Sequence, residues 1–281
     1  MAVILDGKAL ASKIKYKLKI EVENLKKQGI HPKLAVIMVG NDPSSKIYVK
    51  NKSRDCEEVG IDYEEFLLDE NITIDELLLL IERLNNRKDI NGILLQSPIP
   101  KHLNIDLAFS KISPIKDVDG FNPVNVGNLV LNQDTFISCT PYGVLKILEE
   151  YNIDIEGKNA VVIGRSNIVG KPMAMCLLHN NATVTVCHSK TRDLKEITNK
   201  ADILICAIGK AKFVKKDMVK EGAVVIDVGI NRQEDGTLSG DVDFDEVSEI
   251  AGYITKVPGG VGPMTRAMLL ENIVKATRGQ E

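Results

Sequence analysis

Apolar and polar positions show two different spacings in the first part of this chain. Between residues 9 and 29, apolar side chains from Leu10 to Leu25 recur at three- and four-residue steps, the spacing of one face of an amphipathic helix. Residues 33–40 form instead a continuous apolar run of strand length. Such runs are typical of strands covered on both faces, as in a parallel sheet. The pattern therefore predicts a helix followed by a buried strand.

The same alternation continues to residue 96. After a turn over 41–45, a helix capped by Ser44 or Ser45 is predicted to reach Val59 and to stop at Gly60. A second strand is predicted over 63–68. Thr73-Ile74-Asp75-Glu76 has the form of a capping box and opens a leucine-rich helix. A third strand is predicted over 92–96. Because strands alternate with helices throughout, this part of the chain is predicted to be α/β.

A second α/β series opens with the apolar residues 160–163, which run into Gly164, a short polar turn and Gly170. A buried strand that ends in this way can open a helix whose first N–H groups hold a phosphate. The match to the dinucleotide fingerprint G-x-G-x-x-G is imperfect, since Ser166 replaces its second glycine and Gly170 comes one residue late. The motif alone leaves two interpretations open, a nucleotide site and a plain strand–turn–helix.

The strands that follow favour the nucleotide interpretation. Further strands are predicted over 182–187, 202–208 and 223–228, and each ends in glycine or a polar turn. An NAD site carries Asp or Glu after the second strand, to hold the ribose hydroxyls. Here no carboxylate follows residue 187 until Asp193, and the groups available for a 2′-phosphate are Ser189, Arg165, Lys190 and Arg192. The sequence therefore predicts NADP rather than NAD.

Three residues of the first half are candidates for chemistry. Tyr48 and Lys52 are four residues apart on a predicted helix and so share one face. Tyr48 can hold and polarise a substrate, and Lys52 can donate and accept a proton, although a packed tyrosine and a solvated lysine are the commoner case. Gln96 ends an apolar strand, where its buried amide requires either a ligand or a backbone partner.

Two carboxylates, Asp117 and Asp119, alternate in a segment predicted to be extended and so point to opposite sides. One of them is expected to face a cleft and the other to cap the chain or face water, and the pattern does not distinguish them.

Residues 257–265 place three glycines between two prolines. This composition predicts a tightly folded loop that contacts a ligand, because flexible linkers are longer and rich in Gly and Ser. Thr265 is expected to cap a closing helix over 267–277.

Composition and charge exclude several classes of protein. The chain has 281 residues, enough for two domains, with 44% hydrophobic and 27% charged residues and a net charge of −3. Its basic residues are not clustered, which argues against nucleic-acid or membrane-surface binding, and no apolar run reaches the roughly 20 residues of a membrane span. The five cysteines are scattered without metal-ligand spacing. We expect a cytoplasmic protein without a metal.

Four blocks of the sequence, taken together, carry a resemblance to a known family. They are Pro43-Ser44-Ser45-Lys46-Ile47-Tyr48-Val49-Lys50-Asn51-Lys52, Lys116-Asp117-Val118-Asp119-Gly120, Gly164-Arg165-Ser166-Asn167-Ile168-Val169-Gly170-Lys171-Pro172 and Pro258-Gly259-Gly260-Val261-Gly262-Pro263-Met264-Thr265. In this order they resemble the bifunctional methylenetetrahydrofolate dehydrogenase/methenyltetrahydrofolate cyclohydrolase family. The match runs from Ala2 almost to the C-terminus.

The resemblance implies a fold and a reaction. The fold is two α/β domains, the second a Rossmann-like NADP-binding domain, with the active-site cleft between them. The implied domains are 1–139 with 266–281 for catalysis and folate binding, and 140–265 for NADP. The reaction is oxidation of 5,10-methylenetetrahydrofolate with NADP⁺, then hydrolysis of the methenyl product to 10-formyltetrahydrofolate. A homodimer is also implied.

The resemblance further implies the site residues. The catalytic residues, which also bind substrate, are Lys52, Tyr48, Gln96 and Asp119. The cofactor residues are Gly164, Arg165, Ser166, Ser189 and Ile230. The remaining substrate-binding residues are Pro258, Gly259, Gly260, Val261, Gly262 and Thr265.

Two positions depart from the family pattern: Ser97 replaces the usual leucine, and Lys256 the usual proline. Both changes can alter folate affinity, and neither removes a catalytic group.

Two alternatives remain, a dehydrogenase without cyclohydrolase activity and a non-enzymatic NADP-binding protein. The joint presence of Tyr48, Lys52 and Gln96 argues against the second.

Overall fold

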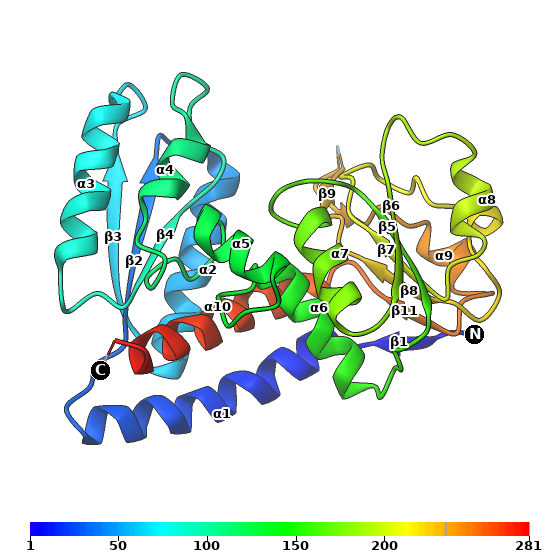
Figure 1. Cartoon of the computed structure of the whole chain (residues 1–281), viewed down its shortest axis with the longest axis horizontal. Coiled ribbons are helices and arrows are strands. Elements are labelled where there is room, and N and C mark those ends of the chain that lie inside the picture. The colour runs from blue at the N-terminus through cyan, green and yellow to red at the C-terminus, as the bar shows by residue number, and fades with distance from the viewer. Residues whose placement is uncertain (234, 281) are drawn as a thin grey trace. The chain divides into compact units, whose positions relative to one another are not determined.

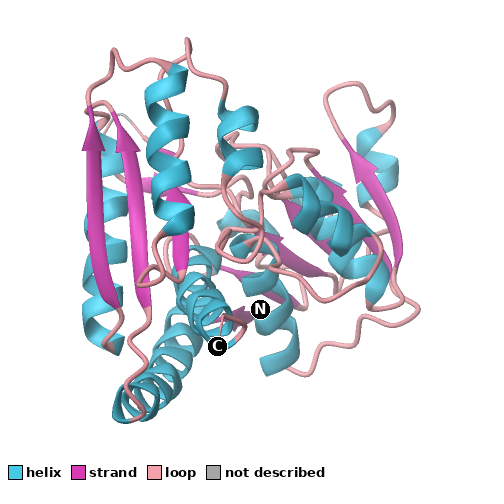
Figure 2. Cartoon of the chain, turned by 60° about the vertical axis from the view of Figure 1, so that its left-hand side comes forward, coloured by secondary structure: helices cyan, strands magenta, loops and turns pink. Residues whose placement is uncertain are grey.

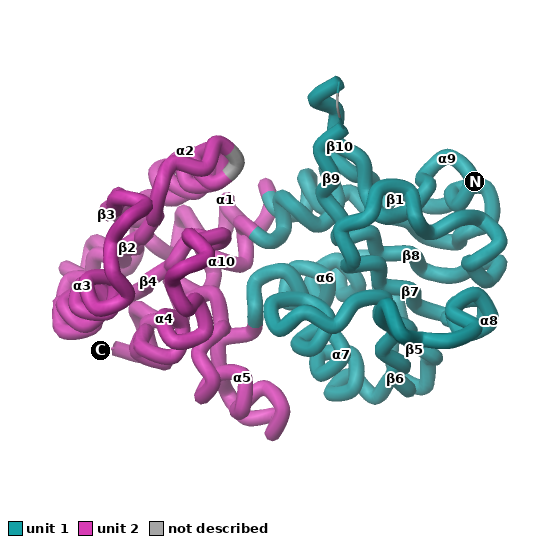
Figure 3. The backbone as a smooth tube through the Cα atoms, turned by 90° about the horizontal axis from the view of Figure 1, so that it is seen from above, with its two compact units in different colours: residues 1–11, 138–265 teal, residues 12–137, 266–281 magenta. Residues whose placement is uncertain are grey.

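The computed structural model describes residues 1–233 and 235–280. The chain divides into two compact units: unit 1 is 1–11 with 138–265, and unit 2 is 12–137 with 266–281 (Figure 3). These units differ from the predicted domains at residues 138–139, which belong to unit 1, and at the N-terminus, where residues 1–11 also belong to unit 1. The reason is that β1 (Val3–Leu5) pairs in parallel with β11 (Tyr253–Thr255). Both strands are too short to give a periodic signal, and the sequence analysis missed them.

Unit 1 is built on a six-stranded sheet whose paired strands are all parallel, in the order β1-β11-β8-β7-β5-β6. The central strands are β5 (Asn159–Ile163), β6 (Thr183–Cys187), β7 (Ile203–Cys206) and β8 (Val224–Asp227). The chain places β6 on one side of β5, then crosses over to place β7, β8 and β11 on the other. This reversal is the topological switch point of a doubly wound dinucleotide-binding fold. The predicted α/β fold with a parallel sheet is confirmed.

The helices of unit 1 cover both faces of this sheet, with α6 and α7 on one side and α8 and α9 on the other (Figure 1). Their bounds are α6 (Cys139–Glu150), α7 (Gly170–His179), α8 (Leu194–Thr198) and α9 (Phe244–Val247), with a 3₁₀ turn, η1, at Lys216–Met218. A small antiparallel pair, β9 (Asn231–Arg232) with β10 (Leu238–Ser239), follows β8. Parallel strands covered on both faces explain the continuous apolar runs of the sequence.

Unit 2 contains a three-stranded parallel sheet in the order β3-β2-β4 (Figure 2). Its strands are β2 (Lys33–Val39), β3 (Asp62–Leu68) and β4 (Gly92–Leu95). The helices are α2 (Pro43–Val59), α3 (Ile74–Asn86), α4 (Ile105–Lys111) and α5 (Pro123–Val130), while α1 (Gly7–Lys27) and α10 (Val261–Arg278) have residues in both units. The central strand β2 is buried along almost its whole length, as its apolar sequence predicts.

Two helix ends in unit 2 form as the sequence predicts. Gly60 ends α2 in the left-handed conformation (φ +83°), which glycine adopts without a steric penalty. At the start of α3, the Thr73 hydroxyl accepts from the backbone N–H of Glu76 at 3.2 Å, and the Glu76 carboxylate accepts from the Thr73 N–H at 2.7 Å. This is the predicted capping box.

The start of α10 differs from the prediction. The helix begins at Val261, so Thr265 lies inside it and its hydroxyl donates back to the Val261 carbonyl at 3.3 Å. Pro263 does not prevent this, because the first turn of a helix leaves its N–H groups without intrahelical partners. The predicted loop therefore ends at Gly260. None of the helices in the described ranges is long and apolar enough to cross a bilayer.

Candidate active site

Lys52 and Gln96 meet in unit 2. The Lys52 ammonium on α2 donates to the Gln96 side-chain oxygen, with Nζ and Oε1 3.0 Å apart. Gln96 follows β4 and is 7% exposed, and its amide nitrogen donates to the backbone carbonyl of Ser97 at 2.6 Å. The amide thus has both a backbone partner and the lysine. Tyr48, one turn before Lys52 on the same helix, leaves 41% of its surface exposed to solvent.

The structure separates the two neighbouring aspartates. Asp117 is buried, and its Oδ2 accepts from the Asn122 N–H at 2.7 Å and from the Asn125 side-chain amide at 2.8 Å. Burial raises the pKa of Asp117 to about 6, although these hydrogen bonds act in the opposite direction. Asp117 therefore braces the start of α5. Asp119 is only half-buried and is the better candidate for contact with a ligand.

The predicted cofactor residues of unit 1 follow the carboxyl ends of its strands. Gly164 follows β5, Ser189 lies just after β6, and Ile230 follows β8. Because the strands are parallel, these ends lie along one edge of the sheet, which we call the cofactor edge. In open α/β sheets, ligands bind outside this edge at the switch point.

The two glycines of the motif permit close packing at this edge. Gly164 has φ +130°, and a Cβ atom there would lie 2.3 Å from the Ala207 carbonyl oxygen. A Cβ atom on Gly170 would lie 2.3 Å from the Gly164 oxygen. Glycine is therefore required at both positions, despite the imperfect fingerprint, and the turn brings the start of α7 against the end of β5.

Ser166 completes this turn. Its hydroxyl accepts from the backbone N–H groups of Val169 at 3.1 Å and Gly170 at 3.3 Å, and its carbonyl accepts from Lys171 N–H at 3.0 Å. The serine that replaces a glycine of the fingerprint thus stabilises the start of α7. Ser166 and its neighbour Arg165 are both exposed at the cofactor edge.

The turn after β6 is held by its own side chains. His188 donates its backbone N–H to the Thr191 hydroxyl at 2.8 Å, and its Nδ1 accepts from Lys190 N–H at 3.1 Å. Ser189 lies exposed between them. The turn presents hydroxyl and basic groups where an NAD site carries a carboxylate.

Residues 257–260, which we call the glycine loop, pack against the start of α1. The Gly259 carbonyl accepts from Lys8 N–H at 2.9 Å, and a Cβ atom on Gly7 would lie 2.0 Å from the Gly260 oxygen. The hydroxyls of Thr265 and Thr140 lie 3.0 Å apart. Of the predicted substrate-binding residues here, Pro258, Gly259 and Gly260 precede α10, whereas Val261, Gly262 and Thr265 are helical.

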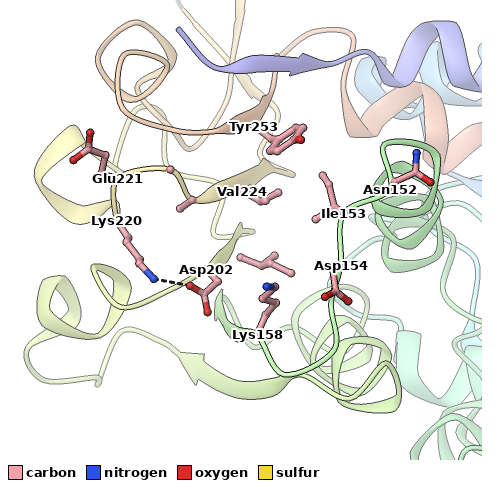
Figure 4. Close-up of a pocket in the computed structure, with 12 residues that line it drawn as sticks. Asn152, Ile153, Asp154, Lys158, Asp202, Lys220, Glu221, Val224 and Tyr253 are labelled. Atoms are coloured by element: carbon pink, nitrogen blue, oxygen red, sulfur yellow. Dashed lines mark hydrogen bonds and ion pairs between the residues drawn. The ribbon is translucent and has the colours of Figure 1, made fainter.

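A cavity of about 330 Å³ in unit 1 contains none of the predicted residues. Its charged and aromatic lining comes from Asp154, Lys158, Asp202, Lys220, Glu221 and Tyr253, and Lys220 donates to Asp202 at 2.6 Å (Figure 4). The lining residues lie at or before the first residues of β5, β7, β8 and β11. The cavity is therefore at the opposite edge of the sheet from the predicted cofactor residues.

Comparisons with known proteins identify the family of this chain. Residues 5–119 match the profile of the tetrahydrofolate dehydrogenase/cyclohydrolase catalytic domain, and residues 138–281 match that of the NAD(P)-binding domain of the same family. The chain belongs to the tetrahydrofolate dehydrogenase/cyclohydrolase family. The predicted family is confirmed.

Individual relatives cover the whole chain. The Bifunctional protein FolD of Ruminiclostridium cellulolyticum is 56% identical over 275 residues, which cover 98% of this chain and 97% of the relative. A crystal structure of the bifunctional FolD dehydrogenase/cyclohydrolase from Campylobacter jejuni has 54% identity, a TM-score of 0.99 and full coverage of both chains. The Trypanosoma brucei FolD, complexed with NADP and an inhibitor, has 38% identity and a TM-score of 0.95, with 99% and 98% coverage. These relatives support a bifunctional rather than a monofunctional member of the family.

Sequence reasoning missed two buried carboxylates of the cofactor edge, Asp227 and Asp241. They are 3% and 0% exposed. The available signal was an aspartate at the end of the apolar run 223–228, and a second one directly after Gly240. A charged residue that ends a buried strand needs hydrogen-bond partners, and those partners come from distant loops.

Proposed function

We propose that the chain catalyses two successive steps of folate chemistry. The first is oxidation of 5,10-methylenetetrahydrofolate with NADP⁺ to the 5,10-methenyl compound, and the second is hydrolysis of that cation to 10-formyltetrahydrofolate. The observation that carries the proposal is the hydrogen bond between Lys52 and Gln96, with Tyr48 one turn away on α2. The FolD relatives support both steps.

The hydrolytic step requires proton transfers that Lys52 can perform. Water adds to the cationic methenyl carbon and loses a proton, and a ring C–N bond then breaks as its nitrogen gains one. We assign the proton transfers to Lys52, since a positioned side chain contributes about 10²–10⁴-fold to such a step. Gln96 orients its ammonium, and Tyr48 holds the folate ring. Asp119 is assigned to bind the N–H groups of the pterin, because a carboxylate accepts strong hydrogen bonds from such donors.

The cofactor edge fits NADP. When bound, the nicotinamide ring accepts the hydride that leaves the methylene carbon. We assign the 2′-phosphate to Arg165 and Ser189, because both are exposed and no carboxylate occurs among residues 188–192. Gly164, Ser166 and Ile230 are assigned to the rest of the dinucleotide. Pro258, Gly259, Gly260, Val261, Gly262 and Thr265 are assigned to the folate.

The proposal is tested by adding NADP⁺ or NAD⁺ to the enzyme with methylenetetrahydrofolate. Reduced cofactor and methenyl absorbance are followed together. We expect reduction of NADP⁺ at a kcat/KM well above that for NAD⁺, followed by decay of the methenyl signal faster than without enzyme. Absence of NADP⁺ reduction would overturn the dehydrogenase assignment, and uncatalysed decay would overturn the cyclohydrolase assignment.

We also propose a homodimer located in the cytoplasm. The dimer rests on the family resemblance, and the location rests on the five scattered cysteines, none of which forms a metal-ligand pair. Sedimentation equilibrium at micromolar concentration tests the dimer, which has twice the 30.9 kDa of one chain. A mass of one chain at every concentration would exclude it.

A further inference from the structure

Asp241 accepts hydrogen bonds from two segments of the cofactor edge, residues 208–210 and Asn231. Its Oδ2 accepts from the backbone N–H groups of Ile208 at 2.7 Å and Gly209 at 3.0 Å, and its Oδ1 accepts from Lys210 N–H at 2.8 Å. The same Oδ1 accepts from the side-chain amide of Asn231 at 3.0 Å. The first three donors belong to the loop after β7, and the fourth, Asn231, is the first residue of β9, directly after the loop that follows β8. One buried carboxylate therefore holds the loop after β7 and the end of the loop after β8, where β9 begins.

Asp227 in turn holds the segment that carries Asp241. Its Oδ1 accepts from the N–H groups of Asp241 at 2.9 Å and Gly229 at 3.0 Å, and its Oδ2 accepts from Val242 N–H at 2.9 Å. Its own N–H donates to the Thr255 hydroxyl of β11 at 2.7 Å. The two aspartates thus form a chain of bonds from the strand ends to the loops.

The backbone leaves room for each carboxylate by means of a glycine. A Cβ atom on Gly229 would lie 2.3 Å from the Asp241 carboxylate, and one on Gly240 would lie 1.8 Å from Asp227 Oδ2. Each glycine flanks one aspartate and faces the other. This reciprocal fit fixes the loop after β8 against the segment 240–242.

The loops in question belong to one half of the dinucleotide site. In a doubly wound sheet, the strands on the two sides of the switch point bind the two mononucleotide halves. β5 and β6, with Arg165 and Ser189, lie on the adenosine side, where the proposed 2′-phosphate site is. β7 and β8 lie on the other side and therefore serve the nicotinamide half. Asp241 bonds to Gly209 in the first of these loops and to Asn231, which directly follows Ile230 of the second.

We propose that Asp241, held in place by Asp227, is a positioning residue for the nicotinamide half of the cofactor. This inference rests on the proposed function, and because Asp241 is 0% exposed, its role is to act through the loops that it holds. A carboxylate is needed because all four groups facing it are N–H donors. Asparagine has nearly the same shape, but its NH₂ group would face donors instead of accepting from them.

The experiment compares Asp241→Asn with Asp202→Asn. Asp202 is a matched control because its carboxylate also accepts a backbone N–H, that of Asn159 at 2.9 Å, but at the opposite edge of the sheet. Binding of adenosine 2′,5′-bisphosphate by calorimetry reports the adenosine half alone. Dehydrogenase kinetics with NADP⁺ report the nicotinamide half, and hydrolysis of added methenyltetrahydrofolate without cofactor reports an intact catalytic unit.

We expect Asp241→Asn to lower the dehydrogenase kcat/KM for NADP⁺ at least tenfold. Adenosine 2′,5′-bisphosphate binding and cofactor-free hydrolysis should stay within twofold of wild type, and Asp202→Asn should leave all three unchanged. The inference is overturned if the variant keeps wild-type dehydrogenase activity. It is also overturned if the affinity for the bisphosphate falls by the same factor as kcat/KM for NADP⁺. That result would show that Asp227 and Asp241 stabilise the whole cofactor edge and not the nicotinamide half alone. Failure of the wild-type enzyme to reduce NADP⁺ would instead reject the proposed function.

Discussion

Lys52 Nζ and Gln96 Oε1 lie 3.0 Å apart, and this contact joins α2 to the residue that follows β4. The acceptor is a neutral amide, so it orients the ammonium group without adding a charge beside it. The amide is itself fixed, because its nitrogen donates to the Ser97 carbonyl. The lysine is therefore presented in a defined direction before any substrate arrives.

Replacement of Lys52 by methionine tests whether this ammonium performs the proton transfers. Methionine keeps much of the length and apolar character of the lysine stem but has no ammonium group and so no proton to transfer. We expect hydrolysis of methenyltetrahydrofolate to fall about 10²–10⁴-fold. The matched control is Lys50→Met, since Lys50 is exposed on the same helix. Wild-type hydrolysis by Lys52→Met, measured by loss of methenyl absorbance, would reject the assignment.

Cofactor preference is expected to depend on Ser189. An aspartate there would repel a 2′-phosphate and would instead suit the free ribose hydroxyls of NAD. For Ser189→Asp we predict that the KM for NADP⁺ rises roughly 10–100-fold, the equivalent of about 1.5–3 kcal/mol, while the KM for NAD⁺ stays the same or falls. Thr183→Asp, exposed at the other end of β6, adds the same charge away from the cofactor edge. Equal effects of the two substitutions would show that net charge, and not the 2′-phosphate, determines the change.

Local signals predicted most elements of the fold. Gly60 and the Thr73–Glu76 capping box mark helix ends through contacts within a few residues, and the long apolar strands are visible as runs. β1 was missed because only Leu5 of its three residues is buried, and its place is set by pairing with a strand about 250 residues away. The start of α10 was misplaced because proline was read as the end of a loop, although it suits the first turn of a helix equally well.

The candidate site shows the same limit. The four-residue spacing of Tyr48 and Lys52 predicted a shared helix face, but the partner of Lys52 is 44 residues away. The role of Asp241 could not be read from sequence either, because the backbone N–H groups it accepts from are about 30 residues earlier. Every residue type except proline has such groups, so they leave no trace in composition. Only the fold brings them together.

The contact between Gly7 and Gly260 provides a third prediction. A Cβ atom at Gly7 would lie 2.0 Å from the Gly260 carbonyl oxygen, so Gly7→Ala must displace either the start of α1 or the glycine loop. We expect a loss of about 1–3 kcal/mol in the free energy of unfolding and a higher KM for the folate substrate. Gly127→Ala in α5 is the control, because nothing lies within 4 Å of its Cβ position. The control should be neutral or stabilising by up to about 1 kcal/mol. An unchanged folate KM in Gly7→Ala would separate this contact from substrate binding.

The buried Asp117 predicts a pH dependence of stability. Its folded-state pKa is about 6, above the value of about 3.9 for an unfolded aspartate. Between these two values the folded chain holds a proton that the unfolded chain has released, so stability contributed by this group falls as pH rises from about 4 to 6. The full difference between the folded and unfolded pKa values corresponds to about 3 kcal/mol in the free energy of unfolding. Glu64, whose pKa is lowered to about 2 by hydrogen bonds from Arg87 and Lys33, gives the opposite dependence. Its contribution cancels when wild type is compared with a variant in which only Asp117 is replaced.

Asp117→Asn isolates this contribution. Asparagine can place its oxygen where Asp117 Oδ2 accepts from Asn122 and Asn125, and it carries no charge at any pH. Relative to wild type, the variant should therefore gain about 2–3 kcal/mol in free energy of unfolding when the pH is raised from 4 to 7. Urea unfolding of both proteins at the two pH values measures the gain, with Glu82→Gln, exposed on α3, as the control for loss of a surface carboxylate. A stability difference that is the same at both pH values, or that changes in the opposite direction, would show that the Asp117 carboxyl is not neutralised on folding near pH 6.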